Sequence, residues 1–264
     1  MKRAERIGIV GGTGMLGSAI IEGLLSSGTV TAETISVLSR SGQPGFLARH
    51  PGLDITTDAD RLCENCGTLL LAVPPAAAAT LRLPAADHLV LSVMAGVTRD
   101  RLSEITGSHR VVRAMSSPAA ALGLAYTPWV ASDGVTAEDR HRTTALFGAI
   151  GLTDALDEEA HLDHFTALTG PVPGFVAFFA DAMTAHAETQ GIPPEAADRA
   201  IRQLFLAAGR MMAEDTLSPA GHVRQMIDYA GTTAAGLQAM EDSPIRGLIS
   251  EGLAAAAAKA REIG

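Results

Sequence analysis

The sequence predicts an α/β fold, with a doubly wound parallel sheet in residues 1–156 and an all-helical domain in residues 157–264. Two patterns support this prediction. In the first region, short apolar runs alternate with helical stretches, and strands that are apolar on both faces belong to parallel sheets covered by helices. In the second region, from about residue 158 onward, apolar residues recur at helical spacing.

The predicted strands and helices of the first region follow from local patterns. The segment "TLLLAV" (68–73) is a continuous apolar run that Pro74 and Pro75 stop, as expected of a buried strand. Residues 15–28 carry apolar residues at helical spacing and end at Gly28, as expected of a helix. The other predicted strands are 6–10, 34–40, 88–96, 109–116 and, nearer a sheet edge, 126–132, and a short helix is predicted over 58–66.

The helical region is rich in alanine and has wide apolar faces. Phe175, Phe178 and Phe179 lie on one predicted helix, and Leu204 and Phe205 lie on another. A few such helices enclose only a thin core, and faces of this kind are usually completed by another subunit. We therefore predict a dimerisation domain and a homodimer, with higher homo-oligomers left open. A monomeric helical cap is the alternative.

The composition argues against several functional classes. With 47% hydrophobic and 19% charged residues the chain is globular, and its formal charge of −9 argues against a nucleic-acid partner or an anionic membrane surface. No apolar run is long enough to cross a bilayer, and the start of the chain lacks a signal-peptide pattern. The two cysteines, Cys63 and Cys66, suit a reducing cytoplasm, which is the expected location.

A glycine-rich turn gives the first indication of function. The segment "GTGMLG" fits G-x-G-x-x-G at Gly12, Gly14 and Gly17, between a predicted strand and a predicted helix. We expect Gly12 to allow the tight turn, Gly14 to let the backbone approach a pyrophosphate, and Gly17 to let the helix pack close to the strand. Free N–H groups at the helix start would hold the phosphates. The pattern predicts a Rossmann dinucleotide site at Gly12, Thr13, Gly14, Met15 and Leu16. A purely structural glycine turn is the alternative.

The residues after the second predicted strand indicate which dinucleotide binds. An NAD site usually has an acidic residue here, which binds the ribose 2′-hydroxyl. This chain instead has Ser39, Arg40 and Ser41, a cation between two hydroxyls. Because these residues suit a 2′-phosphate, we predict NADP (NADPH) as the cofactor in preference to NAD. An ordinary surface arginine is the alternative interpretation of Arg40.

Four further segments carry a family resemblance. They are 161–175 ("HLDHFTALTGPVPGF"), 227–241 ("IDYAGTTAAGLQAME"), 91–102 ("LSVMAGVTRDRL") and 111–119 ("VVRAMSSPA"). In this order and spacing they resemble the pyrroline-5-carboxylate reductase family over nearly the whole chain. The resemblance implies an N-terminal Rossmann domain and a C-terminal helical domain that interlocks in a dimer, sometimes assembled into decamers. It also implies reduction of a cyclic imine by NAD(P)H, with proline as the product of the parent reaction.

The resemblance implies roles for two strand ends in the first region. Ala72, Val73 and Pro74 match a strand end beside the cofactor, where the family usually has Ala-Val-Lys-Pro, so Pro74 stands in the place of the lysine. Ala95 and Gly96 match the next strand end, near the nicotinamide.

The resemblance also implies a substrate turn in the second region. Gly231, Thr232 and Thr233 match the family's Gly-Gly-Thr-Thr turn, which opens a helix and holds the substrate carboxylate on backbone amides. A helix N-terminus binds a carboxylate for the same reason that it binds a phosphate. Thr233 is thereby implied as the catalytic residue, whose hydroxyl orients the iminium or relays a proton. Helix capping is the alternative role for both threonines.

The substrate end departs from the family pattern. Met-Pro-Asn is replaced by Met115-Ser116-Ser117, Ser-Gly-Ser-Gly-Pro-Ala-Tyr by "TGPVPGF" (169–175), and Ser-Pro-Gly-Gly by 228–231 ("DYAG"). The carboxylate of Asp228 would repel a substrate carboxylate unless it points away or is neutralised. We therefore hypothesise an imine other than pyrroline-5-carboxylate, as in a specialised biosynthetic pathway. The predicted substrate-binding residues are Met115, Asp228, Gly231, Thr232 and Thr233.

Two other functions stay open from the sequence: a reductase of the same fold acting on a different imine or carbonyl compound, and a non-catalytic NADP-binding sensor. No metal site is predicted. Cys63 and Cys66 have the spacing of a redox or metal pair but lack a second pair. The trio His161, Asp163 and His164 fits a solvated helix face, and the family resemblance implies a structural place for Asp163. The run 157–159 fits an acidic helix start.

Overall fold

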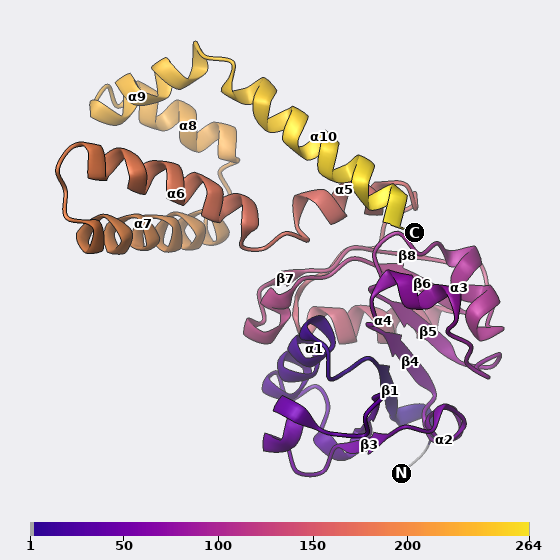
Figure 1. Cartoon of the computed structure of the whole chain (residues 1–264). Coiled ribbons are helices and arrows are strands. Elements are labelled where there is room, and N and C mark those ends of the chain that lie inside the picture. The colour runs from indigo at the N-terminus through magenta and orange to yellow at the C-terminus, as the bar shows by residue number, and fades with distance from the viewer. Residues whose placement is uncertain (1–2, 264) are drawn as a thin grey trace. The chain divides into compact units, whose positions relative to one another are not determined.

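The computed structural model describes residues 3–263, which form two compact units. The first unit comprises Met1–Gly170 and Leu253–Gly264, and the second comprises Pro171–Gly252. Figure 1 shows that the first unit combines strands and helices, whereas the second contains helices only.

The first unit is built around a seven-stranded sheet with the order β3-β2-β1-β4-β5-β6-β8. Its strands run parallel except β8, which pairs antiparallel with β6 at the edge. The chain changes direction across the sheet between β1 and β4, so ligands of such folds bind outside the carboxyl ends of these strands. The strands are β1 Ile7–Val10, β2 Ile35–Leu38, β3 Asp54–Thr56, β4 Thr68–Leu71, β5 Leu89–Ser92, β6 Val111–Ala114 and β8 Trp129–Ala131. The prediction of a doubly wound parallel sheet is confirmed.

Helices cover both faces of this sheet because its strands are apolar on both faces. Ile9 of β1 belongs to one buried cluster, whereas its neighbour Val10 belongs to the cluster on the other face. The first cluster is completed by α1 and α4, and the second by α2 and α3. These helices are α1 Met15–Ser26, α2 Ala59–Asn65, α3 Arg99–Thr106 and α4 Ala137–Gly148.

The predicted strand 126–132 is interrupted. The structure has β7 Ala125–Tyr126 and β8 Trp129–Ala131, separated at Thr127 and Pro128. Proline has no N–H to donate to a sheet ladder, which accounts for the break. The first piece pairs with β9 Gly151–Leu152 in a separate two-stranded sheet.

Ion pairs, each with one buried partner, anchor both ends of β6. Just before the amino end, Arg110 donates from two guanidinium nitrogens to Asp139, which also closes the capping box of α4 with Thr136. Toward the carboxyl end, Arg113 donates to Asp163 over 2.7 Å and to Glu159 over 3.2 Å. Both pairs are charge-assisted hydrogen bonds. In the first pair Asp139 is buried and Arg110 is partly exposed, whereas in the second Arg113 is buried and its carboxylate partners are only slightly exposed.

The carboxyl-end pair holds α5, His161–Leu168, within the first unit. The solvated face expected for Asp163 is therefore wrong, whereas its structural place fits this contact, and Glu159 has an added role. Asp163 does not lie on a solvated face, because its carboxylate contacts Arg113. Glu159 is more than an acidic helix start, since it also accepts hydrogen bonds from Arg99. The domain boundary predicted at 156/157 stays a prediction, and the two compact units divide later, after Gly170.

The second unit consists of helices whose apolar side chains are mostly exposed. In it α6 packs along α7 and α8 packs against α9. Only Ala197, Gly221 and Ala234 are buried among its residues, which all belong to the part of the chain that the structure describes. The helices are α6 Gly174–Thr189, α7 Pro194–Glu214, α8 Pro219–Asp228, α9 Thr232–Glu241 and the first part of α10 Ile245–Ile263. The predicted thin core of the helical region is confirmed.

No helix within residues 3–263 combines the length and the hydropathy that a membrane span requires.

We predict that the Arg110–Asp139 pair makes stability fall with acid. Burial by itself would raise the pKa of Asp139, but the hydrogen bonds from Arg110 and Thr136 outweigh it and hold the pKa below its usual value. A lowered folded-state pKa contributes stability above the unfolded-state pKa, and this stability is lost as the pH falls through the folded-state value. The free energy of unfolding of wild type should therefore fall more steeply from about pH 5 downward than that of Asp139→Asn. Urea titrations across pH measure this; parallel curves for the two proteins would contradict it.

Candidate active site

The turn between β1 and α1 brings bare backbone to the carboxyl edge of the sheet. Gly11 has a φ of +84°, and the N–H of Gly14 donates to the carbonyl of Gly11 over 2.9 Å. Thr13, Gly14 and Met15 are exposed. No side chain in residues 3–263 caps α1, and its first turn has no acidic residue, so its leading amides are free for an anion.

The expected role of Gly12 is wrong in detail. The tight turn is made by Gly11, the residue before it, because only Gly11 in this turn has a positive φ. A Cβ at Gly12 would lie 2.8 Å from Val37 and 2.9 Å from Ile21, so Gly12 is required for packing space. The sequence could have indicated this, because Gly11 and Gly12 are adjacent and Gly11 is the one that directly follows the strand.

Gly17 lies where α1 passes closest to the turn. A Cβ there would come within 2.4 Å of the carbonyl oxygen of Gly11 and 2.8 Å of the Cα of Gly12. Both are backbone atoms, which cannot move aside without moving the turn. By contrast, a Cβ at Gly14 would meet only the Gly11 oxygen, at 3.2 Å. The turn therefore excludes a side chain at Gly17 for its own packing, while Gly14 faces open space.

The end of β2 offers a cation and two hydroxyls. The hydroxyls of Ser39 and Ser41 lie 3.4 Å apart, and the Ser39 side chain is buried. The guanidinium of Arg40 is exposed and has no hydrogen bond or ion pair to any residue in 3–263. Arg49, the next arginine along the chain, is occupied, since it pairs with Glu22 over 2.7 Å. Arg40 is thus the available cation after β2.

The ends of the next parallel strands meet the same edge. A Cβ on Gly11 would lie 2.6 Å from Val73 and 2.9 Å from the carbonyl of Ala72, so the ends of β1 and β4 touch. The other predicted residues at this edge are Pro74 after β4, Ala95 and the left-handed Gly96 after β5, and Met115 after β6. Parallel strands deliver all these positions to one side of the sheet because their carboxyl ends coincide there.

The predicted substrate turn joins α8 to α9 in the second unit. Asp228 ends α8, Tyr229 is 85% exposed, and Ala230 adopts a left-handed φ of 56°, where the family pattern has glycine. Gly231 occupies the cap position just before α9, and no side chain in residues 3–263 caps this helix. Its first turn has no acidic residue, so its amides are as free as those of α1.

The capping alternative for the threonines is wrong. Thr232 and Thr233 lie inside the first turn of α9, and the cap position belongs to Gly231. Both threonines are exposed. Their hydroxyls are therefore placed beside the free amides and are not used to close the helix.

The second unit also contains an apolar groove of about 1040 Å³ between α6, α7, α9 and the start of α10. Phe179, Met183, Phe205 and Ile249 line it, with His186 among the few polar residues. Outside the groove, Phe178 and Met211 are 70% and 66% exposed. Such a surface is more apolar than a monomer usually leaves in water.

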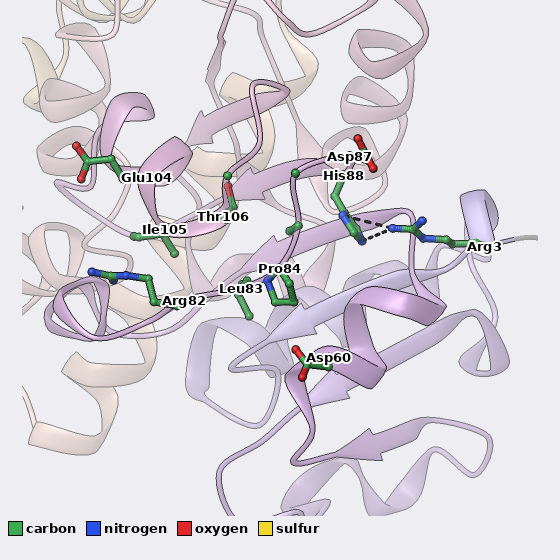
Figure 2. A pocket seen from close by; sticks show the side chains of 13 residues that line it. Arg3, Asp60, Arg82, Leu83, Pro84, Asp87, His88, Glu104, Ile105 and Thr106 are labelled. Atoms are coloured by element: carbon green, nitrogen blue, oxygen red, sulfur yellow. Dashed lines mark hydrogen bonds between the residues drawn. The ribbon is translucent and has the colours of Figure 1, made fainter.

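A further hollow, of about 750 Å³, lies at the other edge of the sheet (Figure 2). It is lined by the segment that leads into the amino end of β5 and by the end of α3, and Arg3 contacts His88 there over 2.8 Å. Because it lies away from the carboxyl ends of the strands, it is not the cofactor site.

The cysteine pair carries no site. Burial raises the pKa of the Cys63 thiol to about 11 and also raises the pKa of Cys66, so both resist forming the reactive thiolate. Within residues 3–263, no three or more His, Cys, Asp or Glu side chains are arranged to hold a metal.

Comparison with known proteins assigns both regions of the chain. Residues 159–263 match the family model described as pyrroline-5-carboxylate reductase dimerisation, and residues 6–96 match that described as NADP oxidoreductase coenzyme F420-dependent. Pyrroline-5-carboxylate reductase 2 of Bacillus subtilis is 31% identical over 247 residues, which are 90% of this chain and 88% of that protein. The Thermus thermophilus pyrroline-5-carboxylate reductase is also 31% identical, over 96% of this chain and 97% of its own length.

The chain belongs to the pyrroline-5-carboxylate reductase family. Two solved structures agree. The pyrroline-5-carboxylate reductase of Coxiella burnetii has a TM-score of 0.88 and 26% identity over 100% of this chain and 99% of that chain. The Plasmodium falciparum enzyme, solved with NADP bound, has a TM-score of 0.83 at 21% identity over the whole of both chains, a likeness of fold. The predicted family, the Rossmann domain and the helical dimerisation domain are confirmed, and the family makes the protein an oxidoreductase.

We predict that Gly14→Ala and Gly17→Ala separate cofactor binding from folding. A methyl group at 14 meets only one atom in the free protein, so the melting temperature should change by no more than about 2 °C, while the methyl should obstruct a phosphate on the turn and weaken dinucleotide binding about tenfold or more. A methyl group at 17 clashes with the turn itself, so Gly17→Ala should lower the melting temperature as well. Differential scanning fluorimetry and fluorescence titration with NADPH measure the two effects. Equal cofactor affinity of wild type and Gly14→Ala would contradict the assignment of the turn.

Proposed function

We propose that this protein reduces pyrroline-5-carboxylate to proline with NADPH. Relatives of that name at 31% identity along nearly the whole chain support the proposal. So does the structural observation that carries it: α1 and α9 both begin at a glycine, without a side-chain cap and without an acid in the first turn. Two uncapped helix starts suit two anions, the pyrophosphate of the cofactor and the carboxylate of the substrate.

The residues of the first unit would bind and orient the dinucleotide. The amides at the start of α1 would hold its pyrophosphate, and Arg40 with Ser39 and Ser41 would hold a 2′-phosphate. When bound, the nicotinamide supplies the hydride that adds to the imine carbon. The strand ends at Gly96 and Met115 would line the space for the reacting ring.

The second unit would bind the acid group and the nitrogen of the substrate. The amides at the start of α9 would bind the carboxylate. The ring nitrogen must carry a proton for the C=N bond to accept hydride. The N–H of that iminium would donate a hydrogen bond to the hydroxyl oxygen of Thr233, which would orient the reacting ring. The completed reaction adds one hydrogen to the carbon and leaves one on the nitrogen, which gives a cyclic secondary amine.

The experiment that tests this function is NADPH oxidation by the purified protein with pyrroline-5-carboxylate and with cyclic imines that lack a carboxylate. We expect the wild-type protein to turn over pyrroline-5-carboxylate. Thr233→Val should lower kcat/KM about 10- to 100-fold. The control Thr144→Val, which changes an exposed helical threonine, should leave kcat/KM unchanged. Turnover of the uncharged imines alone would overturn the proposed substrate and favour the alternative that the exposed carboxylate of Asp228 suggests. Cofactor binding without any turnover would favour the sensor.

We propose NADPH in preference to NADH because Arg40 is the unoccupied cation after β2. Arg40→Ala should lower kcat/KM with NADPH about 10- to 100-fold, the value of a charge-assisted hydrogen bond, and should change kcat/KM with NADH little. Arg49→Ala, which removes the neighbouring arginine that Glu22 occupies, is the matched control. An equal effect of Arg40→Ala on both cofactors would contradict this role.

We propose that the second unit forms a homodimer. Its exposed apolar faces and its match to a dimerisation model support this. Phe178→Glu places a charge on such a face and should shift the protein from dimer toward monomer in sedimentation experiments. Phe46→Glu changes another exposed phenylalanine, 59% exposed in the first unit, and should leave the dimer intact. Monomeric wild type, or dissociation caused by both variants alike, would contradict the proposal.

We also propose a cytoplasmic location, because the two cysteines are buried free thiols, which suit a reducing compartment.

A further inference from the structure

A cluster of charges around the buried Arg113 fixes helix α5 to the carboxyl edge of the sheet. We call Arg99, Arg113, Glu159 and Asp163 the α5 clamp. Arg113 is 4% exposed and donates to Asp163 over 2.7 Å and to Glu159 over 3.2 Å. Arg99 donates to Glu159 from its side chain over 2.8 Å and from its backbone over 2.9 Å. Two cations and two anions balance, which a buried cluster requires.

Both arginines of the clamp lie next to strand ends that the proposed function uses. Arg113 is on β6, two residues before Met115. Arg99 begins α3, three residues after Gly96. The clamp therefore joins the ends of β5 and β6 to α5 and to the residue Glu159 that precedes it.

The far end of α5 touches Met115 itself. A Cβ on Gly170 would lie 2.6 Å from the Cε of Met115 and 2.5 Å from the carbonyl oxygen of Thr166. The methionine methyl group thus rests against the bare Cα of Gly170, just beyond α5. The ring of Phe165 on the same helix packs on Tyr126, with centroids 5.5 Å apart. The conformation of Met115 therefore depends on where α5 lies.

We propose that Asp163 is a positioning residue for the reaction: through Arg113 it fixes α5, and α5 fixes Met115 in the conformation that accepts the imine. This role rests on the proposed function. Without Asp163, the buried guanidinium of Arg113 and the partly exposed guanidinium of Arg99 share the single carboxylate of Glu159. Helix α5 then loses the contact in its own first turn. Met115 then loses the wall at Gly170, and the space beside it changes shape.

The test compares Asp163→Ala with Asp139→Ala. Asp163→Ala removes the partner of Arg113 on β6, and Asp139→Ala removes the partner of Arg110, just before the other end of the same strand. Asp139 has no part in the proposed site. Four quantities are measured: the melting temperature, the Kd of NADPH, kcat and KM for pyrroline-5-carboxylate, and the methyl resonance of Met115 in protein carrying ¹³C-methyl methionine. The resonance is assigned with Met115→Leu.

We expect both variants to melt at lower temperature. Only Asp163→Ala should move the Met115 resonance, raise KM for the imine and lower kcat/KM about tenfold or more, with the Kd of NADPH within about twofold of wild type. Asp163→Asn, which keeps a hydrogen-bond acceptor, replaces the alanine variant if the latter does not fold. It should give the same changes at smaller size.

The role is overturned if the Met115 resonance stays in place in the Asp163 variant. It is also overturned if the two variants lose activity in proportion to their melting temperatures. Failure of the proposed function shows itself separately, as a wild-type protein that binds NADPH and does not turn over the imine. In that case the methyl resonance still reports whether Asp163 holds Met115.

Discussion

The close approach of α1 to the end of β1 is the constraint on which the rest of the site depends. At Gly17 the helix passes so near the turn that a single methyl group would stand 2.4 Å from the Gly11 carbonyl. The helix therefore starts directly at the carboxyl edge of the sheet, with amides that no side chain in the described residues caps. The free amides and the positive end of the helix dipole favour an anion at that point, whatever the net charge of the protein. A protein of net charge −9 can therefore still offer a phosphate site.

The β6 strand links this edge to the segment that follows it. Its arginines are fixed at both ends by buried carboxylates, Asp139 at one end and Asp163 with Glu159 at the other. Removing one partner from such a pair costs more than the pair contributes in net stability, because the remaining charge is left buried. The contacts of Arg113 with Glu159 and Asp163 therefore keep α5 with the sheet. The family match to the dimerisation region begins at residue 159, whereas the first compact unit continues to Gly170. These ion pairs account for the difference between the two boundaries.

The second unit shows the opposite balance. It buries almost none of its own side chains, and it leaves phenylalanines, methionines and leucines in water. A set of helices with so little core cannot repay its conformational entropy by internal packing alone. Membership of a family with a named dimerisation region accounts for this composition, because apolar area that is exposed in one chain becomes core between chains.

The sequence by itself determined the alternation of strands and helices, the glycine turn, the absence of an acid after β2 and the family, since each depends on residues that are near one another in the chain. The tertiary structure decided the rest. It showed that Gly11 makes the turn and that Gly12 leaves room for the side chains of Val37 and Ile21, which belong to β2 and α1. It also showed that Asp163 and Glu159 are the partners of the buried Arg113, 50 and 46 residues away. An acidic residue on a helix has the same local pattern whether it faces water or a distant arginine, so only the packing of the chain distinguishes the two.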